Sequence, residues 1–363
     1  MNFANKKTKN CLIVFSSKRA ANFESLTDIV RAFSSRGYFF DKVSQVAFDD
    51  SEEIVRALKD GSSQYENLVL YCPQAMGQTI MDFIARVKGG EFDGTGQLKS
   101  ENFSAFVMYS DGECFLTVNK IADVLDKKYT LKLERAYVKT VGAPVKKINE
   151  AINKAKSICP DIIFNVTEKF GDCTIEIIYD TNLPKSVFDS VNRAIVGTLS
   201  EFIYALEDIS LAERLVQLLK LRRMKICVAE SFTGGGVCKR LVEISGVSEV
   251  FFEGLNTYSN EAKMSRLKVR ELTLKQYGAV SEQTASEMAL GLIESGNCDV
   301  SIATTGIAGP KSDNTNKPVG LLYIGIGLKD GADVYKYELK GTRENITETA
   351  INLALFLTFK TIK

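Results

Sequence analysis

The chain has 363 residues, 45% of them hydrophobic and 25% charged, which is the composition of an ordinary folded globular protein. Its formal net charge of +1 gives no electrostatic reason to expect binding to nucleic acid or to an anionic membrane. No apolar run approaches the roughly 20 residues that a membrane-spanning helix needs. We therefore expect a cytoplasmic protein of two or three domains.

The cysteines and the absence of histidine limit the chemistry. The eight cysteines are scattered and form no C-x-x-C pair, and the chain has no histidine. A zinc site would need several cysteines to converge, so we expect reduced thiols packed as small apolar side chains, with no metal and no cofactor. Any hydrolytic site must use a base other than histidine.

The first segment, residues 1–127, alternates strand-like and helix-like sequence, which predicts a parallel sheet with helices on its faces. The predicted strands are 11–17, 42–48 and 67–72, and the predicted helices are 21–37, 51–60 and 77–87. A turn-rich loop follows at 89–97. SAFVMYS and ECFLTV then flank Asp111-Gly112, which predicts a β-hairpin.

The second segment, residues 128–205, predicts a small α+β sandwich. Its order is strand 129–140, helix 145–158, strand 161–170, strand 172–180 and helix 184–197, with Gly171-Asp172 between the central strands. Such folds often bind nucleic acid. The segment has no GxxG loop and no evident pair of surface aromatics, so we expect no nucleic-acid partner.

The third segment, residues 206–363, predicts a three-layer α/β domain large enough to bury its own core. It opens with an amphipathic helix at 210–223. The remaining predicted elements are strands 225–230, 251–258 and 300–306, a short helix after the glycines, helix 282–296, a hairpin of 319–328 with 333–339, and a final helix from 344.

Four polar motifs in this third segment predict one small pocket. They are AESFTGGG at 229–236, TYSNEAK at 257–263, GAVSE at 278–282 and TTGIAGP at 304–310. Ser231 lies between a predicted strand and a predicted helix, so its hydroxyl can point over the sheet edge. The amides of Phe232, Thr233 and Gly234 would lie at a helix N-terminus, which attracts anions. Gly234, Gly235 and Gly236 would let a ligand approach the backbone closely. The alternative is that Ser231 only caps that helix.

Lys263 is a candidate base. If a helix begins at Ser259, Lys263 lies one turn further in on the same face as Ser259. A lysine titrates near ~10.4, but burial can lower that value by several units, as serine–lysine dyads require. Tyr258 is a second hydroxyl beside it. The alternative is an exposed helical lysine.

Thr305 and Gly306 end a predicted strand, and ligands of open α/β sheets bind at the carboxyl ends of strands. A Gly-rich turn there can offer amides to a phosphate or an oxyanion. The alternative is a tight turn before Pro310. The polar loop KSDNTNK at 311–317 is a candidate lid.

In this order and spacing, the motifs, with KPVG at 317–320, resemble the carboxy-terminal domain of the CinA family over about 210–361. That resemblance implies hydrolysis of nicotinamide mononucleotide to nicotinic acid mononucleotide and ammonia, in a cytoplasmic homodimer. Positions that the family uses for catalysis or substrate are matched by Ser231, Tyr258, Lys263, Thr305 and Arg343.

The resemblance implies a serine–lysine mechanism without metal. Ser231 attacks the amide carbon, Lys263 takes the serine proton, and Tyr258 orients or relays. Amides near Thr233–Gly235 or Thr305–Gly306 hold the oxyanion, and the other set, with Arg343, takes the phosphate. Asn260 is a further candidate substrate contact.

Three positions depart from the family pattern. Phe232 replaces a cysteine, Asn256 stands where an apolar residue is usual, and Thr342 replaces the acid of a Gly-Asp-Arg motif. These departures leave open an alternative function, a nucleotide-binding or regulatory CinA-like protein with a decayed active site.

The first two segments resemble CinA more weakly, as a degenerate MoaB/Mog-like (molybdopterin-binding-like) domain and a KH-like domain. Where the family carries GGLGPTxDD, this chain reads YCPQAMGQTIMDF; FSSKRA replaces an early G(D/T)EL motif, and LTVNK replaces a PGVP-like loop. The acids for a metal and the glycines for a phosphate are missing. We therefore do not expect the ADP-ribose pyrophosphatase activity assigned to that domain in some relatives.

Overall fold

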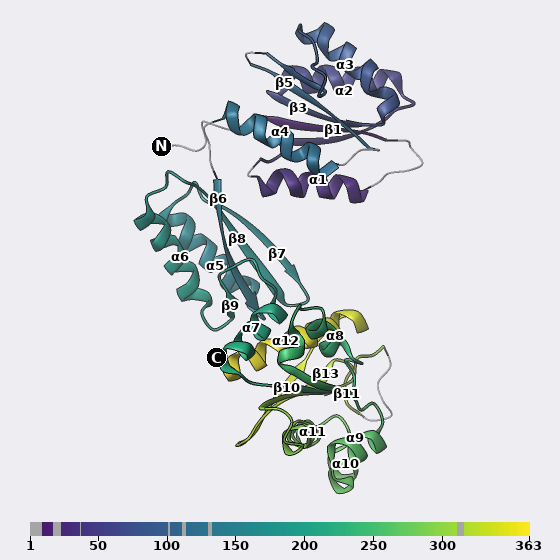
Figure 1. Cartoon of the computed structure of the whole chain (residues 1–363), viewed down its shortest axis with the longest axis vertical. Helices are drawn as coiled ribbons and strands as arrows, with labels where there is room; N and C mark the ends of the chain where they lie inside the picture. The colour runs from purple at the N-terminus through teal and green to yellow at the C-terminus, as the bar shows by residue number, and fades with distance from the viewer. Residues whose placement is uncertain are drawn as a thin grey trace. The chain divides into compact units, whose positions relative to one another are not determined.

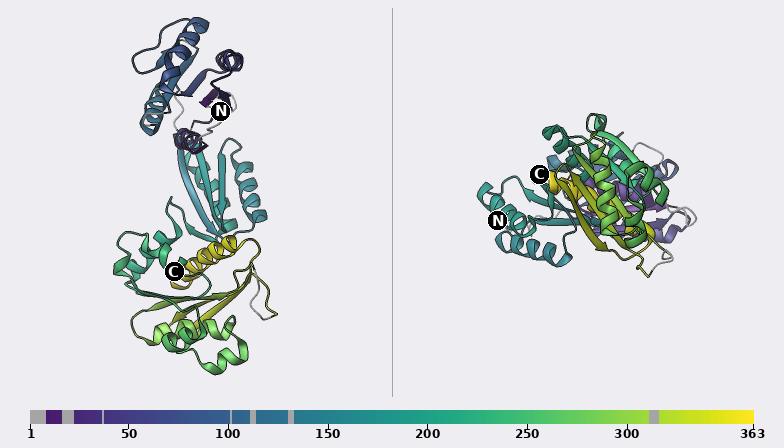
Figure 2. Two further views of the ribbon diagram at one scale, coloured as in Figure 1. Left: turned by 90° about the vertical axis from the view of Figure 1, so that its right-hand side faces the viewer. Right: turned by 90° about the horizontal axis from the view of Figure 1, so that it is seen from below.

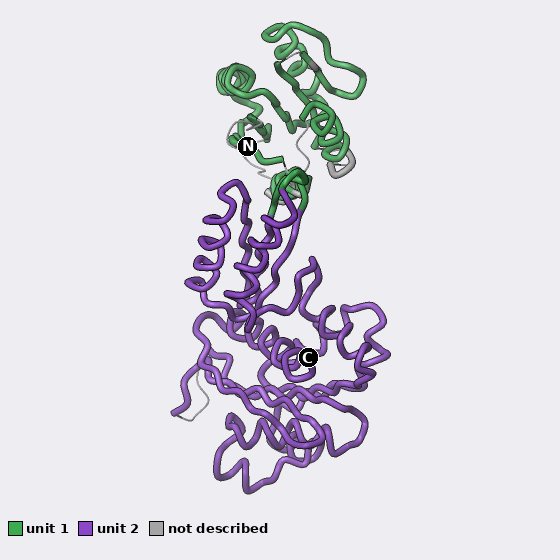
Figure 3. Tube along the Cα trace, turned by 90° about the vertical axis from the view of Figure 1, so that its left-hand side faces the viewer, with its two compact units in different colours: residues 1–134, 178–183 green, residues 135–177, 184–363 purple. Residues whose placement is uncertain are grey.

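The computed structural model describes residues 9–16, 23–36, 38–100, 102–110, 114–129, 133–310 and 316–363. The chain divides into two compact units, residues 1–134 with 178–183, and residues 135–177 with 184–363 (Figure 3). Helices and three separate sheets confirm the predicted mixed α/β class. The domain boundaries near 127 and 205 remain a proposal. None of the described helices is long and apolar enough to cross a bilayer.

The first sheet has the order β2-β1-β3-β5-β4, parallel throughout except for the β4–β5 pair (Figure 1). Its strands are β1 (Asn10–Ser16), β2 (Lys42–Ala47), β3 (Asn67–Cys72), β4 (Gln97–Lys99) and β5 (Ser104–Tyr109). Its helices are α1 (Phe23–Ser35), α2 (Ser51–Gln64), α3 (Gln74–Lys88) and α4 (Cys114–Lys128). Strand residues alternate between a core under α2 and α3 and a core under α1 and α4.

The predicted hairpin in this unit is wrong, because residues from 114 onward form α4 instead of a strand. The buried side chains of α4 are Val118, Ile121, Ala122 and Leu125, and they recur every three or four residues. That helical period continues well beyond ECFLTV and outweighs the strand preference of this short run. Asp111 and Gly112 lie outside the described residues.

The second sheet has the order β7-β8-β6-β9. Its elements are β6 (Leu133–Val141), α5 (Val145–Ile158), β7 (Ile163–Lys169), β8 (Asp172–Asp180), α6 (Lys185–Leu199) and β9 (Ile203–Ala205). Phe170 and Gly171 both have positive φ, at 55° and 77°, as a two-residue type I′ hairpin turn requires. The three-residue β9 was not predicted, because so short a run carries no periodicity.

The third sheet has the order β11-β10-β12-β13-β14. Its strands are β10 (Ile226–Glu230), β11 (Phe251–Asn256), β12 (Val300–Gly306), β13 (Leu321–Leu328) and β14 (Gly331–Glu338). One face carries α7 (Leu211–Arg222), α8 (Gly236–Val242) and α12 (Arg343–Ile362), and the other carries α9 (Asn260–Leu267), α10 (Glu271–Tyr277) and α11 (Glu282–Glu294). Figure 2 shows the yellow helix α12 and the green helices α9 to α11 on opposite faces, as the three-layer prediction requires.

The alternation of buried residues along β10 explains these layers. Ile226 and Val228 join the core with α7 and α12, while Cys227 and Ala229 join the core with α9 and α11. Strands β11 and β12 both pair with β10 in parallel and lie on its two sides. The chain therefore changes direction across the sheet at β10. Ligands of open α/β sheets bind at the carboxyl ends of strands at such a point.

A glycine holds α9 close to α11. A Cβ atom at Gly291 in α11 would lie 2.0 Å from the carbonyl oxygen of Leu267, the last residue of α9. Alanine usually stabilises a helix interior by up to about 1 kcal/mol relative to glycine. Here the backbone of α9 would have to move, so we predict that Gly291→Ala lowers the free energy of unfolding by about 1–3 kcal/mol.

Gly197 in α6 is the matched control, because a Cβ atom there meets no atom within 4 Å. We expect Gly197→Ala to raise the melting temperature and Gly291→Ala to lower it in differential scanning calorimetry. A rise for both variants would contradict the close α9–α11 contact.

Candidate active site

Ser231 is held by the sheet. It is the first residue after β10 and is 8% exposed, and its N–H donates to the Thr304 carbonyl of β12 at 3.0 Å. Helix α8 begins only at Gly236, and Gly235 occupies its N-cap position. Ser231 is therefore not the cap of α8, and its backbone continues the parallel ladder by one residue.

Lys263 reaches Ser231 from α9, which lies on the other face of the sheet from α8. The Ser259 side chain caps α9 by accepting the N–H of Ala262 at 3.1 Å, which places Lys263 in the first turn. Lys263 is 1% exposed, and its Nζ lies 3.1 Å from Ser231 Oγ. The same Nζ lies 2.9 Å from the Thr257 carbonyl and 3.2 Å from the Tyr258 carbonyl.

Burial lowers the pKa of Lys263 from 10.5 to about 8. Among the described residues no carboxylate forms an ion pair with it. A neutral amine has two N–H groups and one lone pair, and the carbonyls of Thr257 and Tyr258 can only accept. They take the two N–H groups, so the lone pair faces the Ser231 hydroxyl. With this pKa, roughly a tenth of the molecules hold the neutral amine near pH 7.

Tyr258 and Asn260 lie at the rim of this arrangement. The Tyr258 side chain is 70% exposed, and the atom of Tyr258 that contacts Lys263 is its carbonyl oxygen. Asn260 is the exposed first residue of α9. Both side chains are accessible to a ligand approaching Ser231 from solvent.

The turn after Ser231 is open on one side. Gly234 and Gly235 have φ of 62° and 98°, values that favour glycine, and a Cβ atom at either would meet nothing within 4 Å. Thr233 is buried beneath them, with its Oγ1 2.7 Å from Thr304 Oγ1. A ligand can therefore approach the backbone of this turn closely.

Sequence reasoning missed Glu230, which is 0% exposed and lies directly beneath the turn. Its Oε2 accepts the N–H of Gly235 and of Val237, each at 3.0 Å, and its Oε1 accepts the N–H of Cys238 at 2.8 Å. The amide of Gly235, expected to face an anion, is thus already bonded. A glutamate ending a buried strand is the signal that was available, because such residues are almost never fully buried without partners.

The amides of Phe232, Thr233 and Gly234 differ from that of Gly235, which donates to Glu230. Among the residues that the structure describes, none accepts a hydrogen bond from their N–H groups. They follow Ser231 directly, so they are the donors best placed for an oxygen bound beside its hydroxyl.

The carboxyl end of β12 forms the other wall. Thr305 is buried, and its Oγ1 donates to the Ala279 carbonyl at 2.7 Å. The Thr304 carbonyl faces β10, and the N–H of Ile307 donates to Leu321 on the β13 side. Because backbone groups alternate along a strand, the N–H of Gly306 points to the β10 side, toward the Ser231 turn.

Arg343 and Thr342 begin α12. Arg343 is exposed, and its Nη1 donates to the Gly309 carbonyl at 2.7 Å, which ties the helix start to the loop after β12. The Thr342 side chain caps α12 by accepting the N–H of Asn345 at 3.2 Å. Threonine therefore keeps the capping role that an aspartate would have at this position.

Lys317, another residue that the sequence reasoning did not single out, holds the 277–280 segment. Its Nζ donates to the carbonyls of Tyr277 at 2.9 Å and Val280 at 2.6 Å. Thr305 holds the carbonyl between them, at Ala279. Residues 311–315 of the candidate lid lie outside the described residues.

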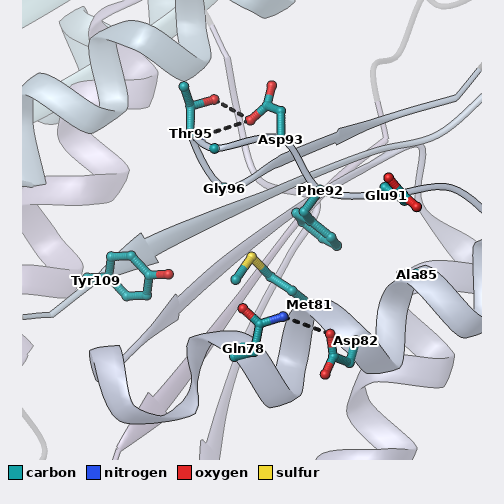
Figure 4. Close-up of a pocket in the computed structure, with 11 residues that line it drawn as sticks. Gln78, Met81, Asp82, Ala85, Glu91, Phe92, Asp93, Thr95, Gly96 and Tyr109 are labelled. Atoms are coloured by element: carbon teal, nitrogen blue, oxygen red, sulfur yellow. Dashed lines mark hydrogen bonds between the residues drawn. The ribbon is translucent and has the colours of Figure 1, made fainter.

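A cavity of about 590 Å³ lies in the other compact unit, between α3 and the loop before β4 (Figure 4). Two of its carboxylates are engaged within the protein: Asp82 accepts from Gln78 at 2.8 Å, and Asp93 accepts the N–H of Thr95 at 2.9 Å. Across the described part of the chain, no three His, Cys, Asp or Glu side chains lie together as a metal site would need.

Comparisons with known proteins concern the unit that holds Ser231 and Lys263. Residues 208–362 match the family described as "CinA C-terminal domain". The chain is 42% identical over 183 residues to a competence-damage inducible protein of Caldicellulosiruptor saccharolyticus, covering 50% of this chain and 44% of that one. It is 45% identical over 177 residues to a CinA-like protein of Fusobacterium nucleatum, covering 48% and 42%. The match thus spans less than half the length of these relatives.

Among solved structures, the chain is similar to the competence/damage inducible protein CihA from Agrobacterium tumefaciens. The two are 34% identical over 42% of this chain and 94% of that one, with a TM-score of 0.41.

The buried amine has a consequence for stability. Because the pKa of Lys263 falls from 10.5 to about 8 on folding, the folded protein loses a proton that the unfolded chain keeps between these pH values. The free energy of unfolding should therefore rise with pH across that window, and below it the charged amine costs about 3 kcal/mol. We predict that Lys263→Met raises the free energy of unfolding by up to about 3 kcal/mol near pH 7.

The gain should shrink as the pH rises toward 10.5, where the wild-type amine is neutral in both states. Urea unfolding of both proteins across this range measures it. Lys275→Met is the control, since Lys275 is exposed and pairs with Glu271. A gain independent of pH would show that Lys263 is not desolvated.

Proposed function

Because residues 208–362 match the CinA C-terminal domain family, we propose that this domain hydrolyses the carboxamide of nicotinamide mononucleotide to nicotinic acid mononucleotide and ammonia. The observation that carries the proposal is the 3.1 Å contact between Ser231 Oγ and a buried lysine whose pKa burial lowers to about 8. A nucleophile and a base that is partly neutral near physiological pH are what amide hydrolysis without histidine requires.

In the first step Ser231 Oγ attacks the carboxamide carbon and Lys263, in its neutral form, takes the serine proton. The carbonyls of Thr257 and Tyr258 fix the amine so that its lone pair meets the hydroxyl. The oxygen of the carboxamide becomes an oxyanion held by N–H groups of the turn at 232–234. Lys263 then gives its proton to the departing nitrogen, the C–N bond breaks, and ammonia leaves an ester on Ser231.

In the second step a water molecule gives a proton to Lys263 as its oxygen attacks the ester carbon. The tetrahedral intermediate expels Ser231 Oγ, which recovers its proton from Lys263. The product is nicotinic acid mononucleotide, which loses a proton to solvent. Lys263 takes and then gives up a proton in both steps, whereas Ser231 is the nucleophile in the first step and the leaving group in the second.

The phosphate is assigned to the other wall of the site. Glu230 occupies the N-terminus of α8, so a second anion is disfavoured there. Arg343 begins α12, a helix of 20 residues, beside the loop that follows Thr305 and Gly306. A guanidinium together with the N-terminus of a long helix suits a phosphate. We therefore assign the oxyanion to the Ser231 turn and the phosphate to the Arg343 side.

The alternative is a nucleotide-binding or regulatory protein with a decayed active site. Its support is the three departures from the family pattern. Phe232 packs in the core under α7 and α12, and Thr342 caps α12. Asn256 is exposed at the end of β11. None of the three replaces Ser231 or Lys263, so we favour catalysis. A cytoplasmic homodimer without a nucleic-acid partner remains part of the proposal.

The first test is ammonia release from nicotinamide mononucleotide by the purified protein. We predict that Ser231→Ala lowers the rate by several orders of magnitude, because it removes a nucleophile that acts as a unit with its base. Ser210→Ala is the matched control: Ser210 caps α7, accepting the N–H of Glu213 at 3.1 Å, and its loss should leave the rate unchanged. Near-normal turnover by Ser231→Ala with an unchanged circular dichroism spectrum would refute the nucleophile.

The second test is the pH dependence of kcat/KM. Activity should rise with pH as Lys263 loses its proton, with a midpoint near the pKa of about 8, at the upper end of the pH 6–8 window that the sequence suggests. Lys263→Arg should be inactive at every pH, because a guanidinium does not deprotonate in this range. Lys275→Arg, on the exposed face of α10, should keep the wild-type profile. Substantial activity of Lys263→Arg with the same profile would make the lysine only a charge for the phosphate.

A further inference from the structure

Glu230 is the one carboxylate in direct contact with the turn that follows the nucleophile, within the described part of the chain. It has no exposed surface, and it accepts the N–H groups of Gly235, Val237 and Cys238 at 2.8–3.0 Å. None of the ion pairs between described residues includes it. No described cation therefore pairs with it, and its printed hydrogen bonds come from backbone N–H groups.

The backbone dipoles at these N–H groups are too small to cancel the charge of Glu230. A helix N-terminus carries the equivalent of about half a positive elementary charge, and α8 is only seven residues long. A full negative charge placed there leaves the end of α8 negative. Glu230 also affects the thiol of Cys238. Burial raises the pKa of Cys238 most, and the hydrogen bond and the charge of Glu230 raise it further. Helix N-termini usually attract anions, whereas the carboxylate of Glu230 makes the N-terminus of α8 unfavourable for a further anion.

The proposed reaction changes the charge of the group bound at this turn. The substrate presents a neutral carboxamide, and the product presents a carboxylate in the same place. Lys263 is largely protonated near pH 7, with a pKa of about 8, and a carboxylate beside it would form a buried ion pair that leaves slowly.

Resting on the proposed function, we propose that Glu230 determines specificity: it makes the turn accept a neutral carboxamide and reject the carboxylate product. Glu230 therefore acts against product inhibition, and it does so without contacting the ligand.

The experiment compares two affinities in one background. Ser231→Ala removes turnover, so calorimetry can measure the Kd of nicotinamide mononucleotide and of nicotinic acid mononucleotide. The amide should bind more tightly than the acid. Adding Glu230→Gln, which removes the charge and keeps the size, should lower the ratio of the acid Kd to the amide Kd on the order of tenfold.

A purely structural role predicts something else. If Glu230 only shapes the turn, Glu230→Gln weakens both nucleotides alike and the ratio stays the same, which would overturn the proposal. Glu287→Gln is the matched control, because Glu287 also accepts a backbone N–H, that of Arg270 at 2.9 Å, in the same domain. Its ratio should equal that of the Ser231→Ala parent.

If Glu230→Gln does not fold, Ser231→Ala alone still decides. If nicotinic acid mononucleotide binds as tightly as nicotinamide mononucleotide, or more tightly, rejection of the product is refuted. If it binds at least about tenfold more weakly, rejection of the product is supported. Ammonia release by the wild-type protein tests the proposed function separately. Turnover with an unchanged ratio overturns only the role of Glu230, whereas no turnover and no binding of either nucleotide overturns both.

Discussion

Removal of one lysine amine from water is the constraint around which the site is organised. Lys263 is almost fully buried, and two carbonyls and one hydroxyl are the partners of its Nζ. Keeping it there costs about 3 kcal/mol near pH 7, a large share of the stability of a typical domain. Two features of α9 help to hold the amine in this place. Ser259 caps the start of α9, and Gly291 lets α11 lie close to its end at Leu267.

The sheet supplies the remaining parts because its strand order reverses at β10. The ends of β10, β11 and β12 therefore meet, bringing Ser231, Thr257 and Gly306 to one edge. Glu230 and Lys263 are the two buried charged side chains there. They have opposite signs and separate surroundings, one bonded to backbone N–H groups and the other to backbone carbonyls. The backbone thus carries the electrostatics of the site, which suits a reaction whose ligand changes charge.

Much of this architecture could be predicted from the sequence, and what was missed has physical causes. Strand–helix alternation predicted the mixed α/β class. A helix carrying Lys263 was predicted to begin at Ser259, and it begins one residue later, with Ser259 as its cap. The strand predicted at 113–118 was wrong. Six residues of mixed propensity are weaker evidence than the helical period, which continues to Lys128. Glu230 was overlooked because its partners are backbone amides, which no side-chain motif reveals.

The proposed chemistry depends on the protonation state of the Lys263 amine, and nuclear magnetic resonance can observe that state directly. Protein labelled with ¹³C at lysine Cε, with the Lys263 signal assigned by comparison with Lys263→Arg, can be titrated in the absence of substrate. We expect a midpoint near the pKa of about 8, well below those of ordinary exposed lysines. A Lys263 signal that stays in its charged form beyond about pH 10 would contradict this expectation, because the amine could then not accept the proton of Ser231.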